Sequence, residues 1–253
     1  MPEYKIIVAN WKMQLTVSEA KQQALNLKKL LGKSKIDKNI EIVICPDFLS
    51  LVEVADIFKG SRVKIGAQDG FYEEAGAYTG QISLSDLKAS GCQYVILGHS
   101  EKRNLGETDI VINKKVRAAL AHGLTPIICV GETFEERKEG QKDLVVMHQV
   151  YQALHEVRLK PKQKIVIAYE PVWVIGSGQA IGSADAYDAA LVIGQSTLDV
   201  FEKESHGSVS IIYGGSVNPE NIKDFTGLPN ISGALVGGAS LDAKTFVSII
   251  KNI

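Results

Sequence analysis

The chain has 253 residues, of which 45% are hydrophobic and 23% are charged, and its 28 basic and 29 acidic side chains give a net charge of −1. This composition is typical of a well-packed globular protein. The balanced charge argues against a protein that binds nucleic acid or anionic membranes by bulk electrostatic attraction.

The three cysteines, Cys45, Cys92 and Cys129, form no close pairs. An odd number without close spacing argues against a disulfide framework or a zinc site and favours a reducing compartment. The first residues carry neither a basic segment nor a signal-length apolar stretch, and no apolar run approaches the roughly 18 residues of a membrane span. We therefore expect a cytoplasmic protein with no bound metal and no membrane contact.

Apolar strands alternate with helical segments along the chain. The first expected strand, 4–10, precedes a helix whose start is marked by the capping-box pair Thr16 and Glu19 and whose end is predicted at Gly32. The further expected strands are 41–45, 63–68, 94–98, 125–130, 165–169, 210–213 and 233–236. The clearest later helices are expected over 109–122, from Ser183 towards Glu204, and over 242–250.

Eight strand–helix units in about 250 residues predict a closed (β/α)₈ barrel that forms a single domain over residues 1–253. The alternative is a doubly wound open sheet, which normally carries a glycine-rich dinucleotide fingerprint after its first strand. Here the first strand ends in Asn10-Trp11-Lys12, without glycine. The barrel is therefore the favoured fold.

In such a barrel the active site is built at the C-terminal ends of the strands. The polar and glycine residues expected there are Asn10, Lys12, Gln68, His99, Glu101, Cys129, Glu132, Glu170, the run Gly214-Gly215-Ser216, and the pair Gly237-Gly238. This set contains carboxylates, a histidine, a lysine and two glycine pairs of the kind that cradle phosphate groups. The strand ends thus predict an enzyme site for a phosphorylated substrate.

Each of these residues also has a structural interpretation. His99 stands at the predicted start of a helical turn, where the helix dipole keeps an imidazole neutral and able to donate to an oxyanion. A lone histidine is also often a hydrogen-bonded structural residue. Lys12 is either a solvated lysine or the positive wall of an anion site. Cys129 lies in an apolar run with no adjacent histidine, which favours a buried packing residue over a nucleophile.

The stretch from Ile165 to Gln179 places a carboxylate, Glu170, at a strand end and follows it with Pro171 and a loop. Proline cannot donate to a sheet ladder, so the strand is expected to stop at Glu170. The loop tip Val172-Trp173-Val174-Ile175 is too apolar to contact only water. The loop is therefore either a lid over 171–181 or a structural loop packed on its own domain.

Taken together, these stretches resemble the triosephosphate isomerase family along the whole chain. The segments that carry the resemblance are Asn10-Trp11-Lys12, Gly66-Ala67-Gln68, Tyr78-Thr79-Gly80, Gly98-His99-Ser100-Glu101-Lys102-Arg103, Cys129-Val130-Gly131-Glu132, Ala168-Tyr169-Glu170-Pro171-Val172-Trp173, Tyr213-Gly214-Gly215-Ser216-Val217 and Leu235-Val236-Gly237-Gly238-Ala239-Ser240. All eight in this order and spacing form a specific signature.

The resemblance implies cofactor-free interconversion of dihydroxyacetone phosphate and D-glyceraldehyde 3-phosphate through an enediolate. In this family the reaction depends on shifted pKa values of the catalytic side chains and on closure of a lid. It implies Glu170 as the base, His99 and Asn10 as groups that polarise the carbonyl, Lys12 as fixed positive charge and Glu101 as a residue that holds Lys12 and His99 in place. It further implies phosphate binding by Asn10, Lys12, Gly176, Ser216, Gly237 and Gly238. A homodimer is implied, with the loop 69–81, and Thr79 near its tip, entering the partner.

Several positions depart from the usual family pattern. In the lid, Val174, Ser177 and Gln179 replace alanine, threonine and lysine, and at the expected dimer interface Gln81 and Lys102 replace glutamate and arginine. Altered lid kinetics or dimer affinity are therefore expected, with activity retained. Two other hypotheses stay open from sequence, a different sugar-phosphate isomerase or lyase and a catalytically silent phosphate-binding barrel.

Overall fold

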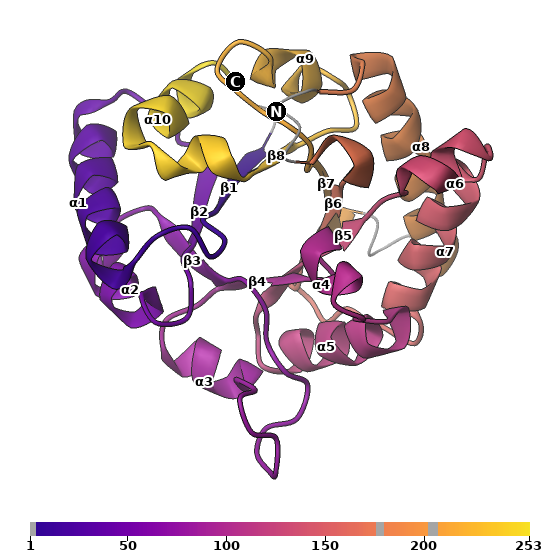
Figure 1. The fold of residues 1–253 in the computed structure, drawn as a ribbon, viewed down its shortest axis with the longest axis horizontal. Coiled ribbons are helices and arrows are strands. Elements are labelled where there is room, and N and C mark those ends of the chain that lie inside the picture. The colour runs from indigo at the N-terminus through magenta and orange to yellow at the C-terminus, as the bar shows by residue number, and fades with distance from the viewer. Residues whose placement is uncertain (1–3, 176–179, 202–206) are drawn as a thin grey trace.

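The computed structural model describes residues 4–175, 180–201 and 207–253, and its strands close into a barrel (Figure 1). The strands are β1 (Lys5–Asn10), β2 (Ile40–Cys45), β3 (Lys64–Ala67), β4 (Tyr94–Leu97), β5 (Thr125–Val130), β6 (Ile165–Tyr169), β7 (Val209–Tyr213) and β8 (Gly233–Val236). All neighbours are parallel, and β1 pairs with both β2 and β8. The predicted (β/α)₈ fold is confirmed, and the pairing of β8 with β1 excludes an open sheet.

Helices surround the barrel (Figure 1). They are α1 (Val17–Lys33), α2 (Leu51–Phe58), α3 (Leu84–Ala89), α4 (Ser100–Asn104), α5 (Asp109–Ala121), α6 (Phe134–Lys138), α7 (Lys142–Leu154), α8 (Ser183–Val200), α9 (Ile222–Thr226) and α10 (Ala243–Lys251), with short 3₁₀ turns η1 (Val172–Val174) and η3 (Gly238–Leu241). In the part of the chain that the structure describes, none of these helices combines the length and apolarity needed to cross a bilayer.

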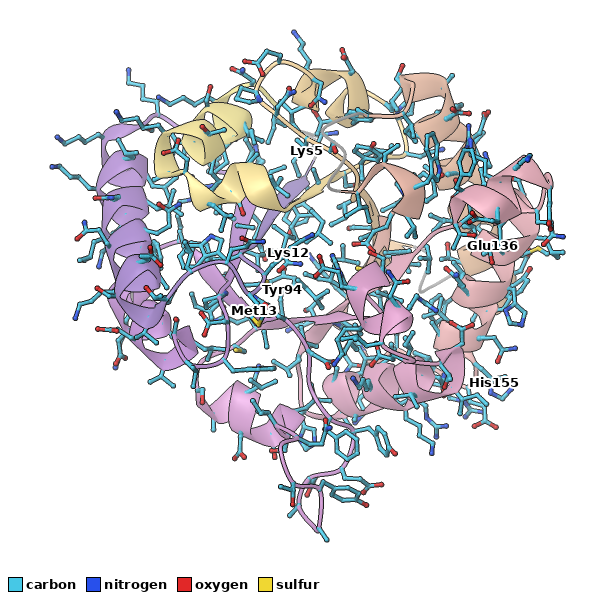
Figure 2. The ribbon with its side chains drawn as sticks, viewed as in Figure 1. Lys5, Lys12, Met13, Tyr94, Glu136 and His155 are labelled. Carbon is cyan, nitrogen blue, oxygen red and sulfur yellow. The ribbon has the colours of Figure 1, made fainter. Side chains whose placement is uncertain are left out.

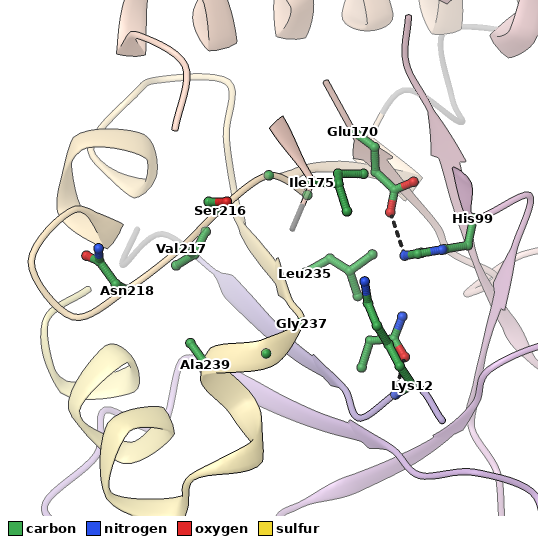
Figure 3. A pocket seen from close by; sticks show the side chains of 14 residues that line it. Lys12, His99, Glu170, Ile175, Ser216, Val217, Asn218, Leu235, Gly237 and Ala239 are labelled. Atoms are coloured by element: carbon green, nitrogen blue, oxygen red, sulfur yellow. Dashed lines mark hydrogen bonds and ion pairs between the residues drawn. The ribbon is translucent and has the colours of Figure 1, made fainter. Parts of the chain in front are cut away.

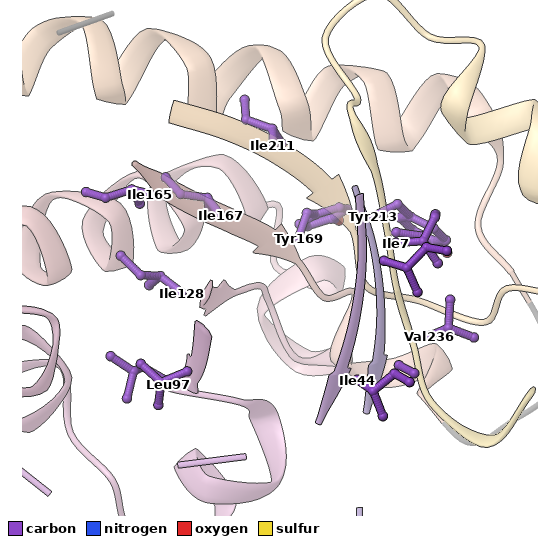
Figure 4. Packing of buried hydrophobic residues seen from close by; sticks show 14 of the residues in the cluster. Ile7, Ile44, Leu97, Ile128, Ile165, Ile167, Tyr169, Ile211, Tyr213 and Val236 are labelled. Atoms are coloured by element: carbon purple, nitrogen blue, oxygen red, sulfur yellow. The ribbon is translucent and has the colours of Figure 1, made fainter. Parts of the chain in front are cut away.

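The hydrophobic core has two layers, because the strands are buried on both faces. Successive residues of β1 alternate between them: Ile6 and Val8 pack inside the barrel, whereas Ile7 and Ala9 face the surrounding helices. Figure 4 shows part of the outer layer. A strand buried on both faces reads as a continuous apolar run, which is why the strands were visible in sequence.

The predicted element ends hold to within a residue or two at most positions, and the capping box of Thr16 and Glu19 is present. Two helix ends were predicted wrongly. Helix α1 continues through Gly32 and is capped at Ser34, so the glycine does not terminate it. Helix α8 ends at Val200 because the next residue, Phe201, is extended and buried, while Glu204 lies outside the described residues.

Candidate active site

A pocket of about 330 Å³ lies at the C-terminal end of the barrel (Figure 3). It brings together four predicted side chains from three strand ends, Asn10 and Lys12 at β1, His99 after β4 and Glu170 after β6, with both glycine pairs. The complete lining consists of Asn10, Lys12, His99, Glu170, Ile175, Gly214, Gly215, Ser216, Val217, Asn218, Leu235, Gly237, Gly238 and Ala239. Residues separated by more than 200 positions in sequence thus share one cavity.

Glu170 follows β6 directly and is 2% exposed. Its Oε2 accepts the backbone N–H of Ser100 at 2.9 Å, and its Oε1 lies 3.1 Å from Nε2 of His99. Apart from this contact with His99, Oε1 has no hydrogen-bond partner among the described residues. A Cβ at Gly214 would lie 2.8 Å from Cγ of Glu170, so glycine there leaves room for the carboxylate.

His99 is the N-cap residue of α4, as its position before a helical turn predicted. The backbone N–H of Glu101 donates to its Nδ1 at 3.2 Å. A ring nitrogen that accepts a hydrogen bond carries no proton, so the neutral ring bears its proton on Nε2. Nε2 is the nitrogen that faces Glu170 and the pocket (Figure 3), and its N–H is available as a donor to a substrate oxygen.

Lys12 has a backbone φ of +53°, an uncommon conformation for a side chain other than glycine. Two contacts hold it: its N–H donates to Oδ1 of Asn10 at 3.0 Å, and its carbonyl accepts Nε2 of Gln68 at 2.9 Å. Its Nζ pairs with Oε1 of Glu101 at 2.8 Å. A Cβ at Gly237 would lie 3.3 Å from Cε of Lys12. The ammonium group is therefore fixed beside the pocket.

The loops after β7 and β8 supply backbone groups to the pocket. Gly238 begins η3, so the turn itself offers its N–H no acceptor. The Ser216 hydroxyl donates to the carbonyl of Val174 at 3.3 Å, which joins this loop to the segment after β6. Asn218 also lines the pocket; it was not singled out in sequence, where Asn-Pro indicates only a turn.

Cys129 is fully buried inside the barrel. Burial is the main cause that raises the pKa of its thiol well above the ordinary value, and the negative charge of Glu170 is the second. A thiol held in its protonated form is a poor nucleophile. The packing interpretation of Cys129 is therefore favoured. Over residues 4–175, 180–201 and 207–253, no three His, Cys, Asp or Glu side chains gather so as to hold a metal ion.

Comparison with known proteins gives one consistent result. The family model described as triosephosphate isomerase matches residues 5–253. The chain belongs to the triosephosphate isomerase family. The protein of that name from Thermoanaerobacter sp. (strain X514) is 46% identical to it, with 97% of this chain and 98% of the relative covered. The one from Dictyoglomus thermophilum is 45% identical, with 98% of this chain and 99% of the relative covered. The one from Endomicrobium trichonymphae is 44% identical, with 97% of each chain covered.

In this member of the triosephosphate isomerase family, the segment after Glu170 is attached to a buried carboxylate, Glu132. Glu132 is 0% exposed and accepts the Tyr169 hydroxyl at 3.0 Å and the Trp173 indole N–H at 3.1 Å. Burial, together with the negative charge of Glu132, raises the pKa of Tyr169. Arg137 lies 3.5 Å from Glu132 and stacks over the Trp173 ring. Sequence placed Glu132 at a strand end but gave no sign of these partners.

The predicted lid is described only in part. Val174 is 1% exposed, whereas Val172, Trp173 and Ile175 are half-buried and Ile175 lines the pocket, so the tip is covered only in part. Gly176, Ser177 and Gln179 lie outside the described residues. The predictions for the phosphate contact of Gly176 and for the two substitutions beside it therefore stay predictions.

The loop between β3 and α3 projects from the barrel (Figure 1). Thr79 and Gln81 are exposed in it. Lys102, where the triosephosphate isomerase family usually has arginine, pairs within its own chain, its Nζ lying 2.9 Å from Oδ2 of Asp69. Burial lowers the pKa of Lys102, but the hydrogen bond and charge of Asp69 outweigh it and leave the pKa raised. The base of the loop is thus tied to α4.

Proposed function

We propose that this protein catalyses the reaction named by its family, the interconversion of dihydroxyacetone phosphate and D-glyceraldehyde 3-phosphate, with Glu170 as the base and no cofactor. The observation that carries the proposal is the juxtaposition of Oε1 of Glu170 and Nε2 of His99, 3.1 Å apart in the pocket that Lys12 also lines. A different sugar-phosphate chemistry would need another acid–base set.

In the proposed mechanism the Glu170 carboxylate removes a proton from the carbon next to the carbonyl. The electrons of the broken C–H bond form a C=C bond, and the carbonyl oxygen becomes an enediolate oxygen. His99 donates from Nε2 to this oxygen, and the Asn10 amide and the Lys12 ammonium stabilise its charge. A proton then passes from the hydroxyl of the deprotonated carbon to the enediolate oxygen, relayed by Nε2 of His99. The protonated Glu170 returns its proton to the carbon that carried the original carbonyl, which gives the other triose phosphate and restores the carboxylate.

We further propose that the substrate phosphate is bound by Lys12, Ser216, Gly237 and Gly238, all of which line the pocket. Backbone N–H groups at the start of a helical turn favour an anion. Glu101 would act through Lys12 and His99, since it contacts both. The lid over 171–181 would exclude water during the reaction, which protects the enediolate from losing its phosphate.

We propose a homodimer, which exposed apolar side chains in the loops after β1, β2 and β3 support. Met13, next to Lys12 in Figure 2, is 93% exposed, and Leu49 after β2 is 84% exposed. Tyr78 is 42% exposed in the projecting loop, beside Thr79. Exposed large apolar side chains of this kind are found at interfaces between chains. A cytoplasmic location is also proposed, since Cys45, Cys92 and Cys129 are unpaired thiols.

The test is a coupled isomerase assay on the purified protein, run alongside light scattering for mass. We expect turnover of D-glyceraldehyde 3-phosphate in the absence of any added cofactor, and the mass of two chains. A folded protein that binds inorganic phosphate but shows no turnover would instead support a silent phosphate-binding barrel. A single-chain mass would contradict the dimer without affecting the assigned reaction.

A further inference from the structure

We infer that Arg103 is a positioning residue for the reaction, which holds the His99 imidazole at its distance from Glu170. The inference rests on the proposed function, since it assigns to Arg103 an effect on the same chemistry. Arg103 does not line the pocket and its side chain is 17% exposed. Any effect on turnover must therefore act through other residues.

Arg103 binds the peptide groups on both sides of His99. Its guanidinium Nε donates to the carbonyl of Gly98 at 2.9 Å, and its backbone N–H donates to the carbonyl of His99 at 3.0 Å. Gly98 has a φ of +69°, where a Cβ would lie 2.7 Å from Cδ1 of Ile112. The turn before His99 is thus a glycine turn with no side chain of its own, and the guanidinium fixes the orientation of its peptide.

That orientation decides where the imidazole points. The direction of a side chain follows from the two peptide planes that flank its Cα. With those planes held, Nδ1 of His99 meets the N–H of Glu101, and Nε2 faces Glu170. A rotation of the Gly98–His99 peptide would move Nε2 relative to Glu170 and would weaken the bond that selects the tautomer.

The same guanidinium also reaches the strand beneath Glu170. Its Nη2 donates to the carbonyl of Cys129 at 3.1 Å. The backbone N–H of Glu170 donates to the carbonyl of the residue after Cys129, Val130, at 2.7 Å. Arg103 therefore connects the backbone that carries the histidine with the backbone that supports the base.

The charge of Arg103 is balanced outside the pocket, because its Nη1 pairs with Oδ1 of Asp109 at 2.6 Å. The planar guanidinium presents donors in several directions at once, whereas a lysine ammonium is a compact point charge on a flexible stem. A lysine at position 103 can keep the pair with Asp109, but it cannot also reach the carbonyls of Gly98 and Cys129 in this geometry. Substitution by lysine therefore separates charge from positioning.

The experiment compares Arg103→Lys with Arg117→Lys, the same change at an arginine that is 52% exposed and pairs only with Glu156 among the described residues. Because a misplacement of about 1 Å can cost about 100-fold in rate, we expect kcat of Arg103→Lys to fall by roughly 10- to 100-fold. We expect KM and the inhibition constant of inorganic phosphate to stay within about twofold, the pattern of a lost transition-state interaction. Arg117→Lys should match the wild type.

A second readout is the ¹⁵N NMR signal of the His99 ring, which does not depend on turnover. The wild type should show one tautomer, with Nδ1 unprotonated and Nε2 protonated. In Arg103→Lys the ¹⁵N chemical shifts of the two ring nitrogens should move towards each other, because both tautomers are populated. The inference is overturned if the variant keeps kcat and the single tautomer, or if it fails to fold, since the arginine would then serve the fold alone. A wild type without turnover would contradict the proposed function, while the tautomer comparison would still test Arg103.

Discussion

Replacement of Glu132 by glutamine tests whether this buried carboxylate anchors the segment that follows Glu170. The carboxylate accepts both the Tyr169 hydroxyl and the Trp173 indole N–H, and it lies in a fully buried position. Glutamine has nearly the same shape, but it offers one acceptor oxygen and presents an NH₂ group where the other oxygen was. The Tyr169 hydroxyl then loses its 3.0 Å bond to Oε2 and keeps only the 3.2 Å bond to Oε1, which it shares with Trp173, and the remaining acceptor is neutral.

The magnitude follows from the number of bonds that change. Hydrogen bonds to a charged group contribute about 1.5–3 kcal/mol each, whereas those between neutral groups contribute about 0.5–1.5 kcal/mol, so each of the two bonds weakens by about 1–1.5 kcal/mol. The loss of the Arg137 contact adds little, because Arg137 keeps its pair with Asp185 at 2.7 Å. We expect Glu132→Gln to lower the free energy of unfolding by about 2–3 kcal/mol, and Tm by roughly 5–10 °C for a chain of this size.

The assay is thermal unfolding at a fixed protein concentration, with Trp fluorescence as a second signal. The matched control is Glu135→Gln, since Glu135 is exposed three residues along the same chain and a surface change of this kind is usually within about 0.5 kcal/mol of neutral. The fluorescence of Trp173 should shift to the red in Glu132→Gln alone. Equal Tm values for Glu132→Gln and Glu135→Gln would refute the reasoning.

Two further predictions concern the helix cap and the thiols. The pKa of Glu19 lies below its ordinary value of 4.5 because the backbone N–H and the hydroxyl of Thr16 donate to it. The ionised carboxylate therefore stabilises the fold above pH 4.5, and this stabilisation is lost as the pH falls through the folded-state pKa. Glu19→Gln should therefore unfold at lower urea than the wild type at pH 7, with a difference that shrinks below pH 4.5; a constant difference would contradict the capping account. Burial raises the pKa of Cys92 to about 12 and those of Cys45 and Cys129 well above the ordinary value. A disulfide reagent at pH 8 should label none of the three thiols in the native protein and all three in denaturant, and rapid native labelling would show that the core opens.

The sequence was sufficient to predict the barrel because its strands are buried on both faces and its units repeat. It also located the residues that meet in the pocket, since the strand ends of a closed barrel converge. The prediction that Gly32 caps the first helix was wrong, because the helix continues to Lys33 and Ser34 is its C-cap. A local pattern cannot decide between two neighbouring residues when tertiary packing extends the helix.

What sequence could not supply is the set of contacts that hold the site residues in place. The φ of +53° at Lys12 is maintained by Gln68, which is 56 positions away. The partners of Glu132 come from two other segments, and the guanidinium of Arg103 reaches Cys129 on the next strand. These bonds depend on backbone carbonyls and buried geometry, which leave no periodic signal in a chain.

The central claim is that Glu170 transfers the proton, and the direct test is the kcat of Glu170→Gln measured with the affinity for inorganic phosphate. Because general acid–base catalysis contributes about 10²- to 10⁴-fold, we predict a fall in kcat of about that size, with phosphate inhibition unchanged within about threefold. A Glu170→Gln enzyme that retains kcat within a few-fold of the wild type would contradict the assignment of Glu170 as the base.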